Sequence, residues 1–247
     1  MIQKDQHIHR RIFIAGATGF CGSAVVQRLA KRNDLSVYAH IRPESKRLHL
    51  VEDWTRNGVT PVQCPWSEIK EALIQIQPEV MMSFIGTTKR QFRQDPNASY
   101  QFIDCDLNVE LIDIAKSIVP SPLFIYLSSM GVEWSRFSRY LQARATVEDT
   151  LKKSDLPSYI VRTGLLTGEQ RDENRPMERY AAWISYPLAH LISSLGYQKG
   201  ADRIKPLDAP DVAQFIDLML QKTVPDESVT VEIDQIHQML RSTLRHE

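Results

Sequence analysis

The sequence predicts an α/β protein with one doubly wound parallel sheet, helices on both faces of that sheet, and a small C-terminal cap on the substrate side. Apolar runs of strand length alternate with helix-length segments, which is typical of a parallel sheet. The strand runs are almost continuously apolar, as burial on both faces requires. The first run leads into a glycine-rich turn that opens a helix, which is where such sheets bind ligands.

The elements follow from this alternation, taken in chain order. Strands are predicted over residues 11–15, 35–41, 59–63, 80–85, 123–127, 158–162 and 229–233. Helices are predicted over residues 20–31, 44–57, 67–75, 99–118, 140–152, 177–195, 209–220 and 235–244.

The chain of 247 residues is long enough for one large α/β domain or two small ones. We expect a flexible tail over residues 1–9, which lacks the apolar core of a secretory signal. A single nucleotide-binding domain is expected over residues 10–247, with its core over 10–164 and the cap, final strand and last helices over 165–247. The polar loop 167–176 separates the core from the cap and is expected to be mobile.

Composition excludes several classes of function. The 30 basic and 30 acidic side chains balance, so no basic surface typical of nucleic-acid binding is expected. Cys21, Cys64 and Cys105 are far apart and form no CxxC pair, which indicates no disulfide framework, no metal site and a reducing, cytoplasmic location. No apolar run is long enough for a transmembrane segment.

The longest apolar stretch, residues 180–195, is interrupted by Pro187 and His190. It is typical of a helical cap or a subunit contact, so a homodimer is one possible assembly. A helix lying on a membrane surface is the alternative.

Gly16, Gly19 and Gly22 follow the first strand with GxxGxxG spacing. Gly16 allows a tight turn, Gly19 lets backbone N–H groups approach phosphates, and Gly22 allows close packing of the helix. The helix N-terminus adds partial positive charge. The turn therefore predicts a dinucleotide pyrophosphate site, and an ordinary strand-to-helix turn is the alternative.

The residue after the second strand is Arg42, with Lys46 and Arg47 behind it. An NAD-selective site places an acidic residue there to hold the ribose 2′-hydroxyl, whereas a guanidinium pairs with a 2′-phosphate. The sequence therefore favours NADP(H) over NAD(H) as the cofactor. An ordinary surface arginine at a strand end is the alternative.

The fifth strand ends in Ser128 and Ser129, and Tyr140 and Arg144 lie one helical turn apart shortly afterwards. A cation near a tyrosine stabilises its phenolate, so the tyrosine can pass a proton while a serine hydroxyl orients the substrate oxygen. This is the layout of a carbonyl reductase site. An exposed tyrosine and a solvated arginine on one helix are the alternative.

Two further strand ends complete the predicted edge. Gly86 would let a cofactor ribose approach, and the backbone after the sixth strand would meet the nicotinamide carboxamide, although turn formation explains these glycines equally well. The residues assigned to cofactor binding here are Gly86, Thr87, Thr88, Arg162, Gly164 and Leu165.

These motifs occur in order and at suitable spacing: GATGFCG, IGTTK, LSSMG, YLQAR and VRTGLLTG. Together they resemble the atypical division of the short-chain dehydrogenase/reductase superfamily, in the branch of Tat-interacting oxidoreductase-like proteins and their bacterial relatives. The resemblance extends from about residue 10 to about residue 220, and it includes residues 204–207 and 211–213.

The resemblance implies a Rossmann-type fold that binds NADP(H), with the catalytic-type serine at Ser128 or Ser129 and the tyrosine at Tyr140. Three positions depart from the family pattern. Arg144 replaces the lysine of YxxxK, Trp66 and its neighbours stand where an Asp near the adenine is common, and Thr163 replaces a common proline. The pyrophosphate loop corresponds to Gly16, Ala17, Thr18, Gly19, Phe20, Cys21 and Gly22.

Three functions are consistent with these residues. The first is an NADP(H)-dependent oxidoreductase that acts on a small carbonyl or hydroxyl compound. The second is a non-catalytic NADPH-binding sensor or assembly protein, which the arginine at position 144 favours. The third is a nucleotide-sugar epimerase or dehydratase, although the resemblance implies a larger C-terminal domain for those enzymes than remains here.

Overall fold

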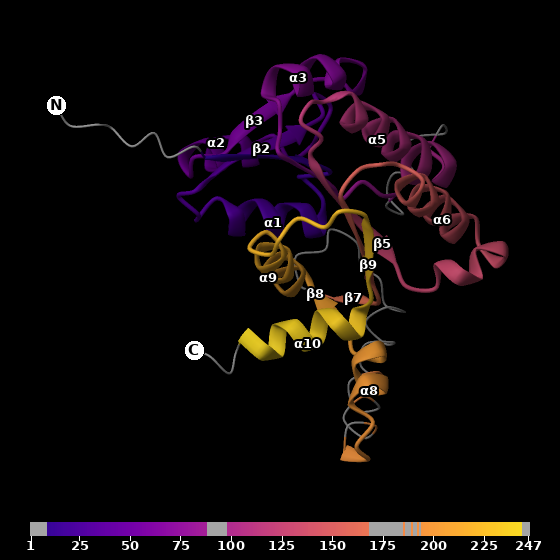
Figure 1. Cartoon of the computed structure of the whole chain (residues 1–247). Coiled ribbons are helices and arrows are strands. Elements are labelled where there is room, and N and C mark those ends of the chain that lie inside the picture. The colour runs from indigo at the N-terminus through magenta and orange to yellow at the C-terminus, as the bar shows by residue number, and fades with distance from the viewer. Residues whose placement is uncertain are drawn as a thin grey trace.

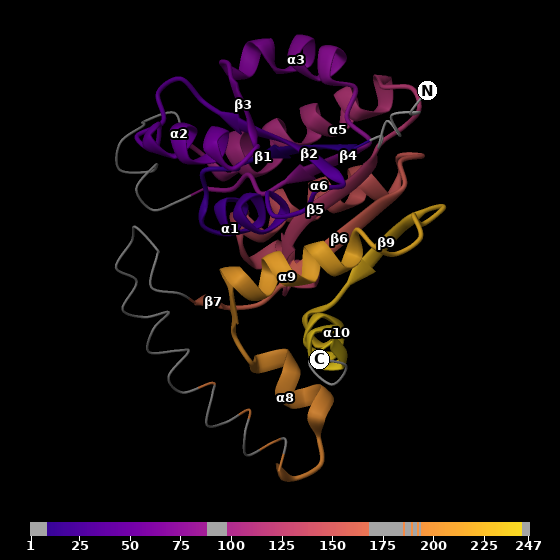
Figure 2. The same cartoon turned by 90° about the vertical axis from the view of Figure 1, so that its left-hand side faces the viewer.

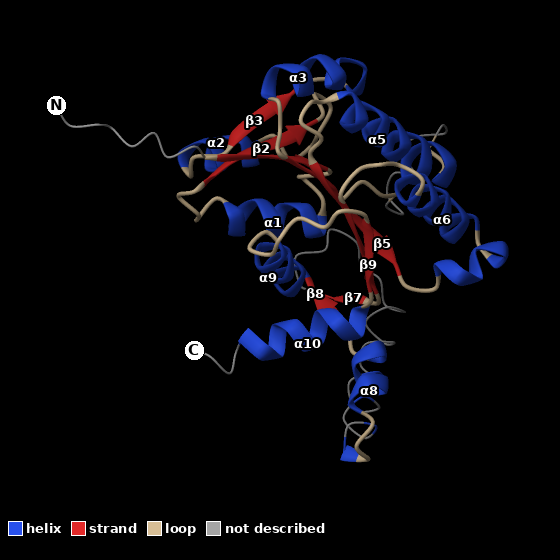
Figure 3. Ribbon diagram, viewed as in Figure 1, coloured by secondary structure: helices blue, strands red, loops and turns tan. Residues whose placement is uncertain are grey.

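The computed structural model describes residues 9–87, 98–167, 185, 189, 192 and 194–243. Its main sheet has seven parallel strands in the order β3-β2-β1-β4-β5-β6-β9. The predicted doubly wound parallel sheet is therefore confirmed (Figure 3). The strands are β1 (Arg10–Ala15), β2 (Leu35–Ile41), β3 (Thr60–Gln63), β4 (Val80–Ser83), β5 (Leu123–Ser129), β6 (Ser158–Thr163) and β9 (Ser228–Val231).

Helices cover both faces of this sheet (Figures 1 and 2). Side chains alternate along β1, so Ile12 and Ile14 join the core on one face and Phe13 joins the core on the other. The first face carries α1 (Phe20–Leu29), α2 (His49–Arg56), α9 (Ala209–Met219) and α10 (Ile233–Thr243), and the second carries α3 (Ile69–Ile76), α5 (Leu107–Ser117) and α6 (Arg139–Lys152).

Two ion pairs connect α9 to α1 and to the turn that follows α1. Asp217 of α9 accepts hydrogen bonds from Arg28 Nε at 2.8 Å and Arg32 Nη1 at 2.9 Å. The Asp217 side chain is only 11% exposed, whereas both arginines reach solvent. The first helix of the chain is thereby fastened to one of the last.

Two predicted helices differ from the structure at their starts, and one predicted strand differs at its end. The helix predicted from residue 44 begins at His49, because the chain first turns after β2 with Ser45 N–H donating to Arg42 O at 3.0 Å. The helix predicted over 99–118 opens as a π-helix, η2 (Tyr100–Asp106). The strand predicted over 229–233 stops at Val231, because the Glu232 N–H is bonded to the Gln235 side chain at 2.8 Å and α10 begins.

The C-terminal part carries elements that the sequence pattern did not predict. Leu166–Thr167 (β7) pairs in parallel with Leu207–Asp208 (β8), and Gln198–Ile204 forms α8, which projects away from the sheet beside α10 (Figure 1). Asp208 and Asp211 form a capping box at the start of α9. The loop predicted over 167–176 lies outside the described residues beyond residue 167, and the helix predicted over 177–195 is described only at residues 185, 189, 192, 194 and 195.

Helices of the described residues are too short or too polar to cross a membrane. Within the same residues, no group of three or more His, Cys, Asp or Glu is placed to hold a metal ion. Among the described residues, Cys21, Cys64 and Cys105 form no disulfide.

Candidate functional site

The predicted functional segments meet at one edge of the sheet, because the carboxyl ends of all seven strands face the same way. Ala15 at the end of β1 is in register with Ser83 of β4, and Ser83 is in register with Tyr126 of β5. The sequence order of the strands reverses direction between β1 and β4, which is the position where open α/β sheets bind ligands.

The glycine-rich turn after β1 is tightly packed backbone. Gly16 adopts φ +72, and a Cβ there would lie 2.6 Å from the carbonyl carbon of Phe84. A Cβ on Gly22 would lie 2.2 Å from Gly16 O, so this glycine lets α1 pack against the turn itself. Both positions therefore accept only glycine without displacement of backbone.

The same turn provides a site for an anion. Gly19 is the exposed N-cap residue of α1, and its N–H donates to Gly16 O at 2.9 Å. It has no side chain to cap the helix, and no acidic residue lies in the first turn. The backbone N-terminus of α1 thus presents partial positive charge, which suits a diphosphate. The residues fit the dinucleotide that the sequence predicts.

Basic residues lie beside this turn. Arg42 is exposed directly after β2. Arg47 is half-buried, and its Nη1 donates to Thr18 O at 2.8 Å, so its guanidinium lies against the glycine-rich turn. Sequence reasoning assigned the 2′-phosphate to Arg42 and placed Arg47 only in support. The signal that pointed to Arg47 was the cluster of three basic residues in the loop after β2.

The segment after β3 is held by a buried histidine. His40 of β2 donates from Nε2 to Cys64 O at 3.1 Å and lies edge-on to Trp66, whose indole N–H donates to Glu110 at 2.6 Å. Burial lowers the pKa of His40, and the nearby charge of Arg42 acts in the same direction. The His40 imidazole therefore fixes the segment after β3.

Tyr140 lies in the first turn of α6, which is capped by Ser138 through a bond from Leu141 N–H at 3.4 Å. The side chain of Tyr140 is half-buried and packs edge-on against Tyr100. The guanidinium carbon of Arg144 lies 5.3 Å from the centre of the Tyr140 ring. The structure thus brings the predicted tyrosine and cation together.

The guanidinium of Arg144 is buried and bonded inside the protein. Its Nη2 donates to Asp104 Oδ1 at 2.9 Å, and its Nη1 donates to Leu127 O at 2.7 Å and to the Tyr126 hydroxyl at 3.2 Å. Burial raises the pKa of Tyr126, and the neighbouring Arg144 offsets only part of this effect. Tyr126 therefore stays protonated at neutral pH.

The two predicted serines differ in their surroundings. Ser128 is buried and donates to Glu148 Oε1 at 2.7 Å, whereas Ser129 is half-buried and donates to Met130 O at 3.2 Å. Side chains alternate along β5, so the two hydroxyls lie on opposite faces. The hydroxyl of Ser128 is therefore hydrogen-bonded to the buried carboxylate of Glu148.

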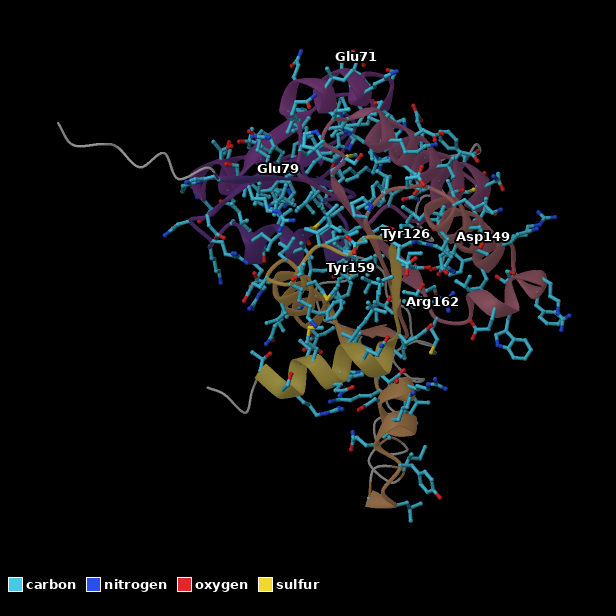
Figure 4. All side chains as sticks on the ribbon, in the orientation of Figure 1. Glu71, Glu79, Tyr126, Asp149, Tyr159 and Arg162 are labelled. Atoms are coloured by element: carbon cyan, nitrogen blue, oxygen red, sulfur yellow. The ribbon has the colours of Figure 1, made fainter. Side chains whose placement is uncertain are left out.

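Arg162 belongs to the same internal network, on the strand next to Tyr126 (Figure 4). It bonds Glu148 through Nε at 3.0 Å and Nη2 at 2.6 Å, and Glu232 through Nη1 at 2.8 Å. Burial alone would raise the pKa of Glu148, but Arg162, Ser128 and Lys152 together hold that pKa below its usual value. The Arg162 side chain therefore links three segments of the protein.

The remaining predicted positions are close to internal partners. A Cβ on Gly86 would lie 2.4 Å from Arg144 Nη2, and the Thr87 N–H donates to Asp104 Oδ2 at 3.1 Å. A Cβ on Gly164 would lie 2.7 Å from Ile233 Cδ1, and Leu165 O accepts from Leu207 N–H at 3.0 Å. Thr88 lies outside the described residues.

Asp104 is the residue that sequence reasoning missed. It lies in η2, and its π-helical backbone is unlike the surrounding α-helix. No local motif singled it out, because both of its partners are distant in the chain.

Residues 16–182 match the model of the family described as NAD(P)H-binding. The chain belongs to this family. The match begins at Gly16 of the glycine-rich turn and continues past Tyr140 and Arg144, so it includes nearly all of the edge described above. The resemblance to atypical short-chain dehydrogenases/reductases agrees with this membership.

A curated relative is the NADH dehydrogenase [ubiquinone] 1 alpha subcomplex subunit 9, mitochondrial, of Arabidopsis thaliana, which is 25% identical over 207 residues. That alignment covers 82% of this chain and 48% of the relative, so the chain spans about half the length of that protein.

Solved structures share the fold of this NAD(P)H-binding protein. A putative NAD-dependent epimerase/dehydratase from Bacillus halodurans superposes with TM-score 0.62 at 18% identity, over 93% of this chain and 99% of the other. The Bordetella bronchiseptica enzyme WbmH in complex with NAD+ superposes with TM-score 0.65 at 15% identity, over 96% and 81% respectively.

Proposed function

We propose that this NAD(P)H-binding protein prefers NADP(H) and acts as an oxidoreductase on a small carbonyl or hydroxyl compound. The observation that carries the cofactor preference is the pair of arginines after β2. Arg42 is exposed at the strand end, and Arg47 contacts the carbonyl of Thr18 in the glycine-rich turn. An exposed arginine at the end of β2 and a guanidinium in contact with the turn favour a 2′-phosphate over a free ribose hydroxyl.

Cofactor preference is tested by calorimetric titration of the purified protein with NADPH and, separately, with NADH. We expect tighter binding of NADPH. In Arg42→Ala we expect the affinity for NADPH to fall about tenfold while NADH is unaffected, since one charge-assisted contact is lost. The matched control is Arg56→Ala on α2, whose partner is Asp53 on the same exposed helix. Equal affinity for the two cofactors would contradict the preference.

The bound dinucleotide would supply or accept a hydride. Tyr140 would hold and transfer a proton at its phenolic oxygen, and Ser128 or Ser129 would orient the substrate oxygen. Gly86, Thr87 and Thr88, with the backbone of Gly164 and Leu165, would border the nicotinamide half. Arg144 would contribute positive charge beside Tyr140.

The catalytic proposal is tested by Tyr140→Phe. Loss of a general acid predicts a fall in the turnover number of about 100-fold with the affinity for NADPH unchanged. The rate is measured by NADPH absorbance across a panel of small carbonyl compounds. Full activity in this variant would remove Tyr140 from the reaction.

A second candidate function is binding without turnover, as an assembly or sensor protein. Two observations favour it: the internal ion pair of Arg144, and the similarity to a subunit of NADH dehydrogenase. Absence of reductase activity in both the natural chain and Arg144→Lys, with NADPH still bound, would support this function. A nucleotide-sugar epimerase or dehydratase ranks third, on the fold of its structural neighbours.

We also propose that residues 10–247 act as one domain, with no nucleic-acid partner, in a reducing and cytoplasmic location. Assembly as a homodimer is part of this proposal, and sedimentation of the purified chain tests it. Imaging of a fluorescent fusion tests the location, and accumulation in mitochondria would contradict it.

A further inference from the structure

We infer that Asp104 is a positioning residue for the nicotinamide half of the dinucleotide site. This inference rests on the proposed function, because it assumes that the segment after β4 borders the bound cofactor. Asp104 is fully buried in η2, so its side chain does not reach the surface where a ligand would bind. Asp104 would act through two hydrogen-bond partners, Arg144 of α6 and the backbone of Thr87 after β4.

The first partner is Arg144 of α6. The guanidinium lies 2.9 Å from Asp104 Oδ1, and both side chains are almost entirely buried. The same guanidinium holds Leu127 O at the end of β5. Asp104 therefore fixes the cation that lies 5.3 Å from the Tyr140 ring and anchors it against the sheet.

The second partner is the backbone after β4. The Thr87 N–H donates to Asp104 Oδ2 at 3.1 Å, and the absent side chain of Gly86 leaves room for Arg144 Nη2. One carboxylate thus receives bonds from a backbone N–H on one side and from a guanidinium on the other. Half-buried Gly86 and the buried Asp104 and Arg144 form one packed unit at the carboxyl end of β4.

This unit explains why an arginine occupies the position of the family's lysine. An ammonium group on Arg144→Lys has one nitrogen, and it does not reach the Asp104 carboxylate, the Leu127 carbonyl and the Tyr126 hydroxyl with the fork geometry of a guanidinium. Hydrogen bonds within the protein thus fix the guanidinium of Arg144 near Tyr140, with no contribution needed from a substrate or cofactor.

The experiment compares Asp104→Asn with the natural chain in two calorimetric titrations, one with NADPH and one with 2′,5′-ADP, which carries only the adenine half. An Asn side chain has one oxygen acceptor, so either Arg144 or the Thr87 N–H loses its partner whichever way the amide is turned. We expect the affinity for NADPH to fall about tenfold, as for one lost bond to a charged group, with the affinity for 2′,5′-ADP unchanged.

The matched control is Asp202→Asn, which removes a different buried aspartate that pairs with Arg241 in the C-terminal part. We expect this variant to bind both ligands normally. If Asp104→Asn does not fold, as judged by circular dichroism, then Asp104→Asn/Arg144→Gln removes both charges and is titrated in the same way. The same selective loss of NADPH affinity is expected from it.

Equal losses for NADPH and 2′,5′-ADP would overturn the positioning role, and so would unchanged affinity for both. Either result leaves the proposed function intact, because the natural chain would still bind NADPH. Failure of the natural chain to bind NADPH and 2′,5′-ADP would instead overturn the proposed function.

Discussion

The glycine-rich turn after β1 and the ends of β5 and β6 lie on the same edge of the sheet. They differ in the kind of interaction that holds them together. The turn is backbone packed against backbone, with Gly16 and Gly22 leaving no space for a side chain. The other region is made of buried charges, in which Asp104 pairs with Arg144 and Glu148 pairs with Arg162. The packing of the turn depends on the absence of side chains, whereas the stability of the second region depends on each buried charge keeping its partner.

This difference predicts which kind of substitution each region tolerates. Shape is lost when any atom is added to the turn, whereas charge balance is lost when either partner of a pair is removed. The pyrophosphate half should therefore be sensitive to small additions, and the nicotinamide half should be sensitive to neutralisation. Two substitutions test this contrast, and a third experiment tests the buried histidines outside both regions.

The largest effect is expected for Arg144→Met, which leaves the Asp104 carboxylate buried without a counter-charge. Breaking such a pair costs about 3–5 kcal/mol, so the free energy of unfolding measured by urea denaturation should fall by that amount. Arg241→Met is the comparison variant, because the Arg241 side chain is 38% exposed and water can replace part of its role. A loss in Arg144→Met no larger than that in Arg241→Met would remove the distinction between the two regions.

A smaller effect is expected for Gly22→Ala. The added Cβ meets Gly16 O at 2.2 Å, and overpacking of this kind costs about 1–3 kcal/mol of folding stability. The turn must also shift away from the shape that fits a diphosphate, so the affinity for NADPH should fall about tenfold. Calorimetry measures the change. Gly200→Ala in α8 provides the control, since its Cβ would meet Ile192 at an ordinary 3.5 Å. Normal NADPH binding by Gly22→Ala would show that the turn is not a closely fitted site.

The smallest effect concerns pH. Burial lowers the pKa of His40 and of His237 below the ordinary histidine value of 6.5, so the unfolded chain binds protons that the folded chain excludes. This stabilising contribution is complete above about pH 6.5 and is lost as the pH falls. We expect the slope of the free energy of unfolding between pH 7 and 5 to be shallower in His40→Gln, and shallower again with His237→Gln added. An unchanged slope in the double variant would place the pH dependence elsewhere.

The sequence predicted the regions of this protein that depend on local pattern. The sheet follows from short apolar runs, and the turn follows from three glycines within seven residues of a strand. Spacing on one helix also brought Tyr140 and Arg144 together correctly. These features need no knowledge of what lies opposite them in the folded chain.

The internal partners could not be predicted in the same way. Asp104 is 40 positions from Arg144, and Glu232 is 70 positions from Arg162. A helix pattern shows which side chains share a face but not which distant carboxylate meets them. The starts of α2 and α5 were missed for a related reason, because a turn after β2 and a π-helical segment depend on local hydrogen bonds rather than on apolar spacing.

The attachment of α1 to α9 through Asp217 has a consequence for how the protein matures. During synthesis the ribosome releases the amino end first, and α9 follows only after some two hundred residues have been translated. Until then Arg28 of the nascent α1 lacks its carboxylate partner. The glycine-rich turn is therefore made early, whereas the helix that α1 packs against is made late.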